Sequence, residues 1–423
     1  MKIAVIGGGS TYTPELIEGF ARRADALPFT ELVLHDVNPD RLAVVGGLAR
    51  RILGRDGLAD RLRLTTARDE ALDGASAVLI QLRVGGQQAR MVDETLPGKF
   101  GLLGQETTGP GGFAKALRTV PVVLDIADEV VRRAAPDAWI VDFTNPVGIV
   151  VRALLDAGHR ALGLCNVAIG FQRRLARAFG VDASRVRLDH AGLNHLSWIR
   201  GVHVDGVDRL PELLDGELGD LGEQLAREVG APIELLRTIR AVPSYYLRYY
   251  YCTDQAVHEQ RTGSTRAAEV LEIENALLEL YRNPDLDHKP ELLERRGGAY
   301  YSEAAAGLVT SLLTGDGALH YVDLRNGSTI AGLPEEAVVE VPARVGRDGA
   351  RPLPVAPLPP EMLGLVQAVT AYEVLTIRAA RTGSRDTALR ALLANPLVRQ
   401  WELAVPLLDE LLAANRAHLP QFG

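Results

Sequence analysis

The N-terminal segment carries the pattern that most restricts the fold of this chain. Residues 2–6 form a short apolar run, and the glycine-rich turn GGGS follows at 7–10. A helix-like segment then spans about 14–23, and a second apolar run at 32–36 ends in Asp36. This order of strand, glycine turn, helix, strand and acid is typical of a Rossmann βαβ unit.

The glycine turn predicts a dinucleotide-binding site. Glycines let the backbone approach a pyrophosphate, and the N-terminus of the next helix offers amide donors to it. Asp36 stands where a carboxylate would bind the adenosine ribose hydroxyls, which favours NAD over NADP because an acid repels the 2′-phosphate. Tyr12 occupies the place of a third glycine, so a tight turn without a ligand is the alternative interpretation. The candidate cofactor contacts are Gly7, Gly8, Gly9, Ser10, Thr11, Asp36 and Arg83.

The remainder of the 423-residue chain favours an α/β protein with two closely joined domains. Strand-like runs at 77–81 and 139–142, separated by helix-like stretches, predict a parallel doubly wound sheet. From about residue 181 the pattern changes to alternating runs such as 196–204, which predict an antiparallel ribbon. We therefore predict a Rossmann domain over residues 1–180 and an α+β domain over residues 181–423.

The second domain also contains several predicted helices. Helical patterns occur near 211–240 and 264–280. The proline-rich stretch 341–360 predicts an extended surface excursion, and the chain from Pro360 onward predicts helices with breaks at Gly383 and Pro396.

Composition excludes several classes of protein. Hydrophobic residues make up 47% of the chain and charged residues 24%, which is the balance of a soluble globular protein. The net charge of -8 argues against nucleic-acid binding, and no stretch approaches the ~20 apolar residues of a membrane span. The N-terminus does not resemble a signal peptide, and Cys165 and Cys252 make no disulfide framework, so we expect a cytoplasmic protein. Lysine is scarce, so an anion site would rely on arginine.

Polar clusters follow several predicted strands, and the carboxyl ends of such strands are where ligands bind. Cys165 and His195 are a candidate metal pair, although each alone is more often a buried or locally satisfied side chain. A cluster of tyrosines at 245–251 is most simply explained as core packing. One of these tyrosines could act as a general base if a nearby cation stabilised its phenolate.

These segments together resemble glycoside hydrolase family 4, the NAD-dependent glycosidases, and most closely its 6-phospho-β-glucosidase branch. The resemblance runs from residue 1 through the C-terminal helices. The matching segments are GGGSTYTPEL at the start, RVGG at 83–86, GLLGQETTGPGGFAKALRTVPV at 101–122, DFTNPVG at 142–148, CNVAIG at 165–170, AGLNHLSW at 191–198, PSYYLRYYY at 243–251, RGGAYYSEAA at 296–305 and LPEEAVVEVP at 333–342.

The resemblance implies a reaction and its cofactors. NAD+ takes a hydride from C3 of the sugar, a base removes the C2 proton, and the C1 leaving group is eliminated. Water then adds, and NADH returns the hydride. A divalent metal, Mn2+ in the family, polarises the C2 and C3 oxygens. The implied substrate is a phosphorylated disaccharide or β-glucoside, and the family expectation is a homodimer or homotetramer.

The resemblance also implies roles for individual residues. Cys165 and His195 are the metal ligands, with substrate hydroxyls and water completing the shell. Tyr246 is the C2 base, and Tyr245 is the fallback because the doubled tyrosine leaves the register uncertain by one. Asn166 stands where the α-glycosidase branches commonly have an acidic aspartate, which favours β-linked substrates. The candidate sugar or cofactor contacts are Arg83, Arg90, Glu106, Asn145, Asn166 and Asn194, and the candidates for the 6-phosphate are Ser10, Thr11, Arg248 and Arg296.

Three alternatives stay open at this point. The first is the same family with another substrate, namely an α-galactoside, an α-glucuronide or a 6-phospho-α-glucoside. The second is a plain NAD-dependent hydroxy-acid dehydrogenase of the lactate or malate type, to which the N-terminal half is broadly similar and which needs no metal. The third is a non-catalytic NAD-binding regulator.

Overall fold

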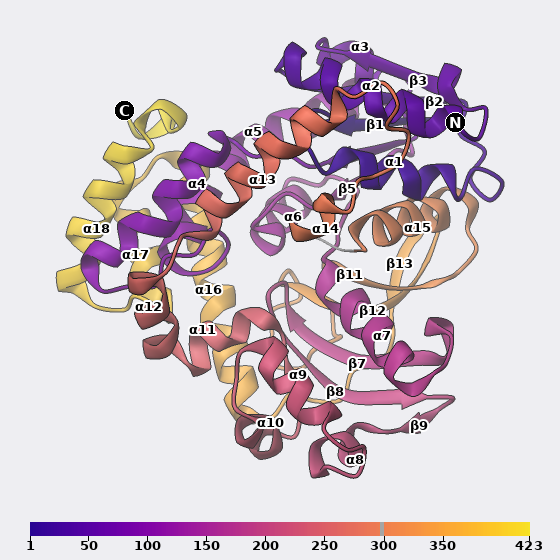
Figure 1. Cartoon of the computed structure of the whole chain (residues 1–423). Helices are drawn as coiled ribbons and strands as arrows, with labels where there is room; N and C mark the ends of the chain where they lie inside the picture. Colours follow the sequence, from indigo (N-terminus) through magenta and orange to yellow (C-terminus); the bar gives the residue numbers. More distant parts are fainter. Residues whose placement is uncertain (297–299) are drawn as a thin grey trace.

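A computed structural model describes residues 1–296 and 300–423, apart from the side chain of Ser302. Gly297, Gly298 and Ala299 of the RGGAYYSEAA segment therefore lie outside the described residues. Within the described part, one sheet of 13 strands runs through the molecule (Figure 1). Its strands are β1 (Lys2–Ile6), β2 (Glu31–His35), β3 (Leu62–Thr65), β4 (Ala77–Ile80), β5 (Trp139–Asp142), β6 (Ala161–Gly163), β7 (Val186–Leu193), β8 (Leu196–Val204), β9 (Val207–Asp208), β10 (Val242–Pro243), β11 (Leu319–Arg325), β12 (Val338–Gly346) and β13 (Gly349–Pro352).

The N-terminal half of the sheet is parallel. Its order is β3-β2-β1-β4-β5-β6, the order of a Rossmann fold. The central strands β4 and β5 are buried along their whole length, as expected for a parallel sheet covered on both faces. The predicted strands at 77–81 and 139–142 are confirmed.

The other half of the sheet is antiparallel and continues directly from β6. The order β6-β11-β12-β7-β8-β10 brings strands from residues 319–346 between β6 and β7, and β9 and β13 pair at the sides. The predicted ribbon at 196–204 is confirmed as β8, which pairs antiparallel with β7. The architecture is therefore the predicted α/β fold with a parallel sheet and an α+β continuation, and the division at residue 180 stays a prediction.

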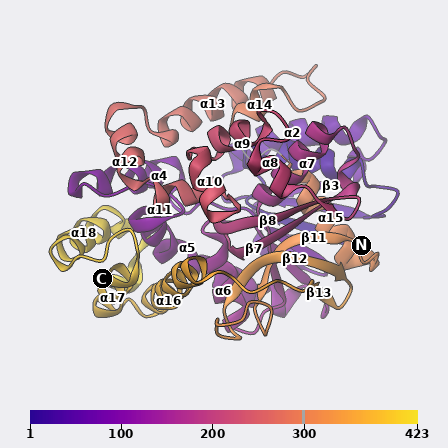
Figure 2. The same ribbon diagram turned by 90° about the horizontal axis from the view of Figure 1, so that it is seen from below.

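Helices cover both faces of this sheet. Seen from below, α7 to α9 lie on one side of the antiparallel strands, whereas α6 and α16 lie on the other (Figure 2). Helix α2 begins after Asn38, whose side chain accepts from the backbone of Arg41, with Pro39 in its first turn. The main helices are α1 (Thr13–Ala21), α2 (Pro39–Gly54), α3 (Arg68–Leu72), α4 (Gly86–Thr95), α5 (Gly109–Arg133), α6 (Val147–Asp156), α7 (Asn166–Phe179), α8 (Leu210–Asp215), α9 (Leu221–Val229), α10 (Ile233–Ile239), α11 (Arg248–Tyr251), α12 (Thr253–Thr262), α13 (Arg266–Tyr281), α14 (Leu292–Arg295), α15 (Tyr301–Thr314), α16 (Pro360–Thr382), α17 (Arg385–Ala394) and α18 (Trp401–Ala414).

The prediction of a surface excursion over 341–360 is wrong for the first part of the stretch, whereas most residues from 347 onward are exposed or half-buried. Residues up to Gly346 belong to the buried strand β12, and β13 pairs with it as a hairpin. The backbone carbonyl of Pro342 accepts from Leu353, which follows the end of β13. In a strand, the N–H and C=O of one residue point to the same side, so an N–H at position 342 would also have pointed toward Leu353. The proline therefore removes no hydrogen bond from the ladder with β11 or β7. Only residues 353–359 lack regular structure.

The helices predicted in the second domain are confirmed. The segment 211–240 folds as α8, α9 and α10, and the segment 264–280 folds as α13. Helix α16 ends at Gly383, which has a φ of 66° and is suited to a helix C-terminus. Among the described residues, no helix is both long enough and apolar enough to span a membrane.

Candidate active site

Two adjoining cavities open at the carboxyl ends of the parallel strands. One has a volume of about 480 Å³ and the other about 470 Å³, sizes that suit a sugar and part of a dinucleotide. Both are lined by Ser10, Gln81, Leu82, Arg83 and Arg296, so they join at the glycine turn. A ligand in one cavity therefore lies next to a ligand in the other.

The glycine turn forms one wall of the second cavity. Gly7 has a φ of 93°, and a Cβ atom there would lie 2.4 Å from the Gln81 carbonyl oxygen, so only glycine fits. Asp36 also lines this cavity, and its Oδ2 accepts from the backbone N–H of Gly9 at 2.8 Å. Gly9 and Ser10 line it too, whereas Thr11 is fully buried and hydrogen-bonds to Glu274.

Replacement of Asp36 by alanine is expected to weaken NAD+ binding by about tenfold to a hundredfold, because charge-assisted hydrogen bonds contribute about 1.5–3 kcal/mol. Titration of NAD+ into the protein, followed by tyrosine and tryptophan fluorescence, measures the change. Asp40→Ala is the matched control, since Asp40 is an exposed acid in the first turn of α2. Equal affinity in Asp36→Ala and the wild type would contradict a ribose-binding role.

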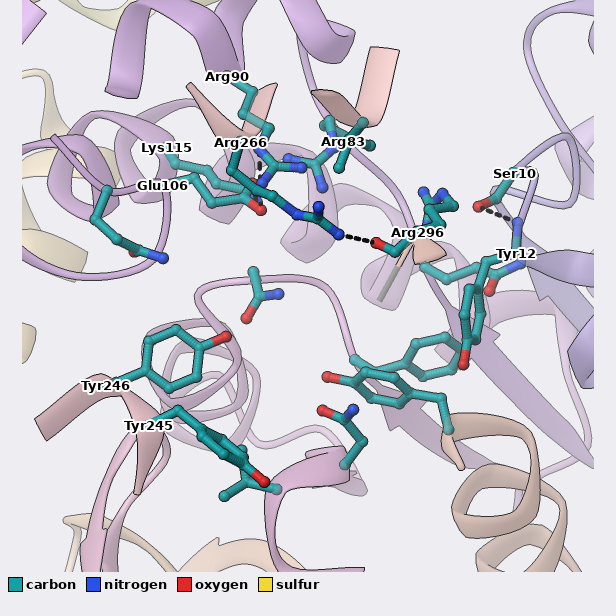
Figure 3. A pocket seen from close by; sticks show the side chains of 18 of the residues that line it. Ser10, Tyr12, Arg83, Arg90, Glu106, Lys115, Tyr245, Tyr246, Arg266 and Arg296 are labelled. Carbon is teal, nitrogen blue, oxygen red and sulfur yellow. Dashed lines mark hydrogen bonds and ion pairs between the residues drawn. The ribbon is translucent and has the colours of Figure 1, made fainter. Parts of the chain in front are cut away.

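A cluster of cations forms one wall of the first cavity. Glu106 is ion-paired to Arg83, to Lys115 Nζ at 2.6 Å and to Arg90 Nε at 3.3 Å. Figure 3 shows these side chains together around the Glu106 carboxylate. Burial alone would raise the pKa of Glu106, but Arg83, Lys115 and Arg90 hold it well below its ordinary value. Arg90 also pairs with Glu94 Oε1 at 2.7 Å, so three cations face two carboxylates in this wall.

The charge state of this wall depends most on Lys115. Its side chain is only 2% exposed. Burial and the neighbouring Arg83 lower the pKa of Lys115 to about 7, against the opposing effect of Glu106. An anionic ligand would favour the protonated form.

Two further arginines line the same cavity. Arg266 donates to the backbone carbonyls of Arg295 and Arg296 at 2.8 and 3.0 Å. The Arg296 guanidinium pairs with Glu274 at 2.9 Å and lies over the ring of Tyr12 (Figure 3). Arg248, in contrast, pairs with Glu259 at 2.6 Å and does not line either cavity.

The candidate metal ligands lie beside the first cavity, behind residues that line it. Cys165 immediately precedes α7, is buried, and contacts Asn166 Oδ1 at 3.9 Å and the Tyr301 hydroxyl. His195 lies in the two-residue turn between β7 and β8 with a φ of 63°, and its ring stacks on Tyr246 with centroids 3.7 Å apart. Two loops that are distant in sequence thus reach one side of the cavity.

The protonation state of His195 suits a metal ligand, whereas Cys165 would become a thiolate ligand only beside a bound cation. Burial lowers the pKa of His195 to about 4, so the ring is neutral at pH 7, which is the form that binds metals. Burial and the Glu340 carboxylate raise the pKa of the Cys165 thiol well above its ordinary value, so a bound cation would be needed to stabilise the thiolate. Among the described residues, no group of three or more His, Cys, Asp or Glu side chains is arranged to hold a metal.

The two neighbouring tyrosines point in different directions. The Tyr246 side chain is stacked on His195, and its hydroxyl points toward the open part of the cavity (Figure 3). Tyr245 stacks on Phe171, and its hydroxyl donates to Glu228 at 2.8 Å. Burial raises the pKa of Tyr246 well above its ordinary value, so deprotonation of this residue requires a nearby cation.

Three asparagines were predicted to contact the sugar. Asn145 and Asn166 line the first cavity, and the buried Oδ1 of Asn145 has no hydrogen-bond partner among the described residues. Asn194 lines neither cavity. Its amide nitrogen donates to Glu340 Oε2 at 2.8 Å and to Asp323 Oδ2 at 3.3 Å, which suggests a supporting role instead.

The structure adds cavity residues that the sequence did not single out. Lys115, Arg266 and Tyr301 all line the first cavity. Lys115 carried a usable signal, because it is one of few lysines and falls inside the glycine-rich segment at 101–122. Arg266 carried no such sequence signal, since it lies at the start of a helix with ordinary composition.

Comparison with known families identifies the chain. A model of the family 4 glycosyl hydrolases matches residues 2–181, and a model of the C-terminal domain of the same family matches residues 190–398. The chain is a family 4 glycosyl hydrolase. The resemblance predicted from the motifs is confirmed.

Relatives of this glycosyl hydrolase align along its whole length. A probable 6-phospho-beta-glucosidase of Bacillus subtilis is 42% identical, covering 100% of this chain and 98% of the relative. A solved structure of the 6-phospho-beta glucosidase from Thermotoga maritima, with manganese, NAD+ and glucose-6-phosphate, has a TM-score of 0.91 at 36% identity over 99% of both chains. A phospho-alpha-glucosidase of Clostridium acetobutylicum is 30% identical over 99% of this chain and 98% of its own.

The fold of this glycosyl hydrolase is shared with 2-hydroxy-acid dehydrogenases. A lactate dehydrogenase of Cryptosporidium parvum has a TM-score of 0.55 at 17% identity, covering 90% of this chain and 98% of the dehydrogenase. This likeness is one of fold alone. The predicted similarity to lactate and malate dehydrogenases is confirmed at that level.

Proposed function

We propose that this enzyme hydrolyses 6-phospho-β-glucosides with bound NAD+ and a divalent metal, preferably Mn2+. One observation carries the proposal. The cavity beside Cys165, His195 and Tyr246 opens into the cavity of the glycine turn, with Ser10 and Arg83 at the junction. A sugar and a nicotinamide ring would therefore lie side by side.

NAD+ would be held by the glycine turn and Asp36. The φ of Gly7 and the bond between the Gly9 N–H and Asp36 set this loop in the shape that a dinucleotide requires. When bound, NAD+ supplies reversible removal of hydride from C3 of the sugar. Ser10 and Arg83 border both cavities and would orient the two ligands toward each other.

Cys165 and His195 would hold the metal ion. A neutral imidazole and a thiol that contacts a cavity residue fit such an ion, and Asn145 Oδ1 is a further buried acceptor without a partner in the described chain. Substrate and water oxygens would complete the shell. When bound, the metal supplies Lewis-acid polarisation of the substrate oxygens.

Tyr246 would accept the proton from C2 of the sugar. Its ring is fixed by the stacking contact with His195, and its hydroxyl faces the cavity (Figure 3). Tyr245 is a poorer candidate, because its hydroxyl is already bonded to Glu228 on another side. We therefore assign the base to Tyr246 and a packing role to Tyr245.

The positive wall would bind the 6-phosphate of the substrate. Arg83, Arg90 and Lys115 outnumber the two carboxylates paired with them, Glu106 and Glu94, and Arg266 and Arg296 line the same cavity. Ser10 and Arg296 remain candidates from the sequence. Thr11 and Arg248 are less suitable, because neither lines the cavity and each is bonded elsewhere.

The preference for β-linked substrates is supported by Asn166. It lines the cavity at the start of α7, where its amide cannot protonate a leaving group as an aspartic acid would. The higher identity to the probable 6-phospho-beta-glucosidase of B. subtilis than to the phospho-alpha-glucosidase of C. acetobutylicum agrees with this choice. We further propose that the enzyme is cytoplasmic and forms a homodimer or homotetramer, the oligomeric states that the family resemblance implies.

Release of p-nitrophenol from p-nitrophenyl β-glucoside 6-phosphate tests the proposal. We expect turnover of this compound, but not of its α-anomer or of the unphosphorylated β-glucoside. Omission of NAD+, Mn2+ or thiol in turn should abolish the activity, without net formation of NADH. Turnover of the α-anomer alone would indicate a 6-phospho-α-glucosidase instead, and steady NADH formation from a hydroxy acid would contradict the glycosidase chemistry.

A further inference from the structure

The two candidate metal-ligand loops are separated in the sheet by two intervening strands. Cys165 follows β6, and His195 follows β7, but the order of the sheet here is β6-β11-β12-β7. The relative placement of the two loops is therefore set by strands from a distant part of the chain. A residue that bonds these intervening strands to one of the loops is therefore a candidate for fixing the position of a metal ligand.

One row of residues crosses all four strands. Gly163 pairs with Asp323, Asp323 pairs with Glu340, and Glu340 pairs with Gly192. Paired residues on neighbouring strands project their side chains from the same face of a sheet, so the two carboxyl groups lie together. The row ends two residues before Cys165 on one side and three residues before His195 on the other.

Glu340 makes two bonds to the segment that carries His195. The side chain of Glu340 is only 1% exposed, its Oε1 lies 2.6 Å from His190 Nε2, and its Oε2 accepts from Asn194 Nδ2 at 2.8 Å. His190 is in β7 and Asn194 is the first residue of the turn. The same carboxylate thus holds the strand and the turn.

The turn itself needs such support. His195 has a φ of 63°, a left-handed conformation that is unfavourable for a residue with a Cβ atom. Among the described residues, the 2.8 Å bond from Asn194 to Glu340 is the shortest side-chain hydrogen bond to the turn, whereas Asn194 donates to Asp323 Oδ2 at 3.3 Å and the Ser244 hydroxyl donates to the His195 carbonyl at 3.3 Å. Loss of the Glu340 contact would leave the turn free to relax and move the imidazole.

We propose that Glu340 is a positioning residue, which bridges His190 and Asn194 and thereby holds His195 in place for metal binding. This inference rests on the proposed role of Cys165 and His195 as metal ligands. Glu340 itself touches neither the cavity nor the proposed substrate. Partners that orient a metal ligand in this way commonly change metal affinity about tenfold to a hundredfold when altered.

Two substitutions separate the geometry of the bridge from its charge. Glu340→Asp keeps the charge but is one methylene too short to reach both His190 and Asn194. Glu340→Gln removes the charge but can still accept from Asn194 and donate to an unprotonated Nε2 of His190. Glu373→Gln is the matched control, because Glu373 is another buried acid of this region that has no hydrogen bond to the turn among the described residues.

The measurement is the dissociation constant of Mn2+, from the electron paramagnetic resonance signal of free Mn2+ with NAD+ and glucose 6-phosphate present. We expect E340D to bind Mn2+ about tenfold to a hundredfold more weakly than the wild type. We expect E340Q and E373Q to stay within about threefold, and all variants to bind NAD+ normally. Thermal unfolding of each variant shows whether it is folded, and N194A, which removes the donor that bonds both Glu340 and Asp323, should bind Mn2+ at least as weakly as E340D.

Each outcome has a defined meaning. Wild-type Mn2+ affinity in folded E340D or N194A would overturn the proposal, and so would equal weakening in E340Q and E340D, since the effect would then not follow the geometry. The metal site is tested separately with C165S and H195A. If these two bind Mn2+ as the wild type does, the proposed function fails, whatever Glu340 does.

Discussion

Replacement of Cys165 by serine is expected to reduce Mn2+-dependent turnover by at least about a thousandfold. Lewis-acid stabilisation by a metal contributes several kcal/mol to the transition state, and 4 kcal/mol corresponds to about that factor. Cys165 is buried beside the cavity, and serine would replace a thiolate ligand by a hydroxyl that is not deprotonated at neutral pH. The measurement is the initial rate of p-nitrophenol release at saturating substrate, NAD+ and Mn2+.

The second cysteine provides the control. Cys252 is half-buried at the start of α12 and lines neither cavity, so Cys252→Ser should keep activity near that of the wild type. The protection of activity by thiol reagents should also persist in this variant, because oxidation of Cys165 is the expected cause of inactivation. Full activity in Cys165→Ser would show that the sulphur is not a metal ligand.

Replacement of Tyr246 by phenylalanine is expected to reduce kcat by about a hundredfold to ten-thousandfold, the usual contribution of a general base. The ring that stacks on His195 would remain, so Mn2+ and NAD+ affinities should change little. The measurement combines kcat with the primary isotope effect of a substrate deuterated at C2. Removal of the base should make proton abstraction more strongly rate-limiting, so the isotope effect should increase or stay large.

Tyr245→Phe is the matched control for this experiment. It removes the hydroxyl bonded to Glu228 but keeps the ring stacked on Phe171, so we expect activity within a few-fold of the wild type. If Tyr245→Phe loses activity and Tyr246→Phe does not, the base is one residue earlier than we assign. An intact rate in both variants would place the base elsewhere in the cavity.

The sequence was sufficient to predict the role of a residue where that role depends on the local backbone. The glycine turn, the acid that follows β2 and the strands before them can be predicted from neighbouring residues in the chain, and the structure places Gly7, Gly9 and Asp36 around one cavity. The stretch 341–360 was misread because prolines at the side of a sheet resemble those of a loop. Whether a proline costs a hydrogen bond depends on the neighbouring strand, which the sequence does not reveal.

The same distinction between local pattern and tertiary arrangement applies to the candidate site. The motifs indicated the family and pointed to Cys165, His195 and the tyrosine pair, and the structure brings these residues to one side of one cavity. The direction of each side chain was not available from the motifs. Arg248 and Asn194 have motif positions like those of the other candidates, yet they bond to Glu259 and Glu340 and line neither cavity.

By itself, then, the sequence determined the βαβ start, the α/β class and the set of side chains available for chemistry, because these depend on short-range patterns of residue type. Only the tertiary structure decided that the hydroxyl of Tyr246 points into the cavity while that of Tyr245 bonds to Glu228 (Figure 3), that Lys115 and Arg266 line the same cavity, and that Glu340 bonds to the turn at His195. The last of these depends on the register between strands that are more than a hundred residues apart, in which Glu340 pairs with Gly192. That register is set by packing of the whole sheet, and no single segment of the chain contains it.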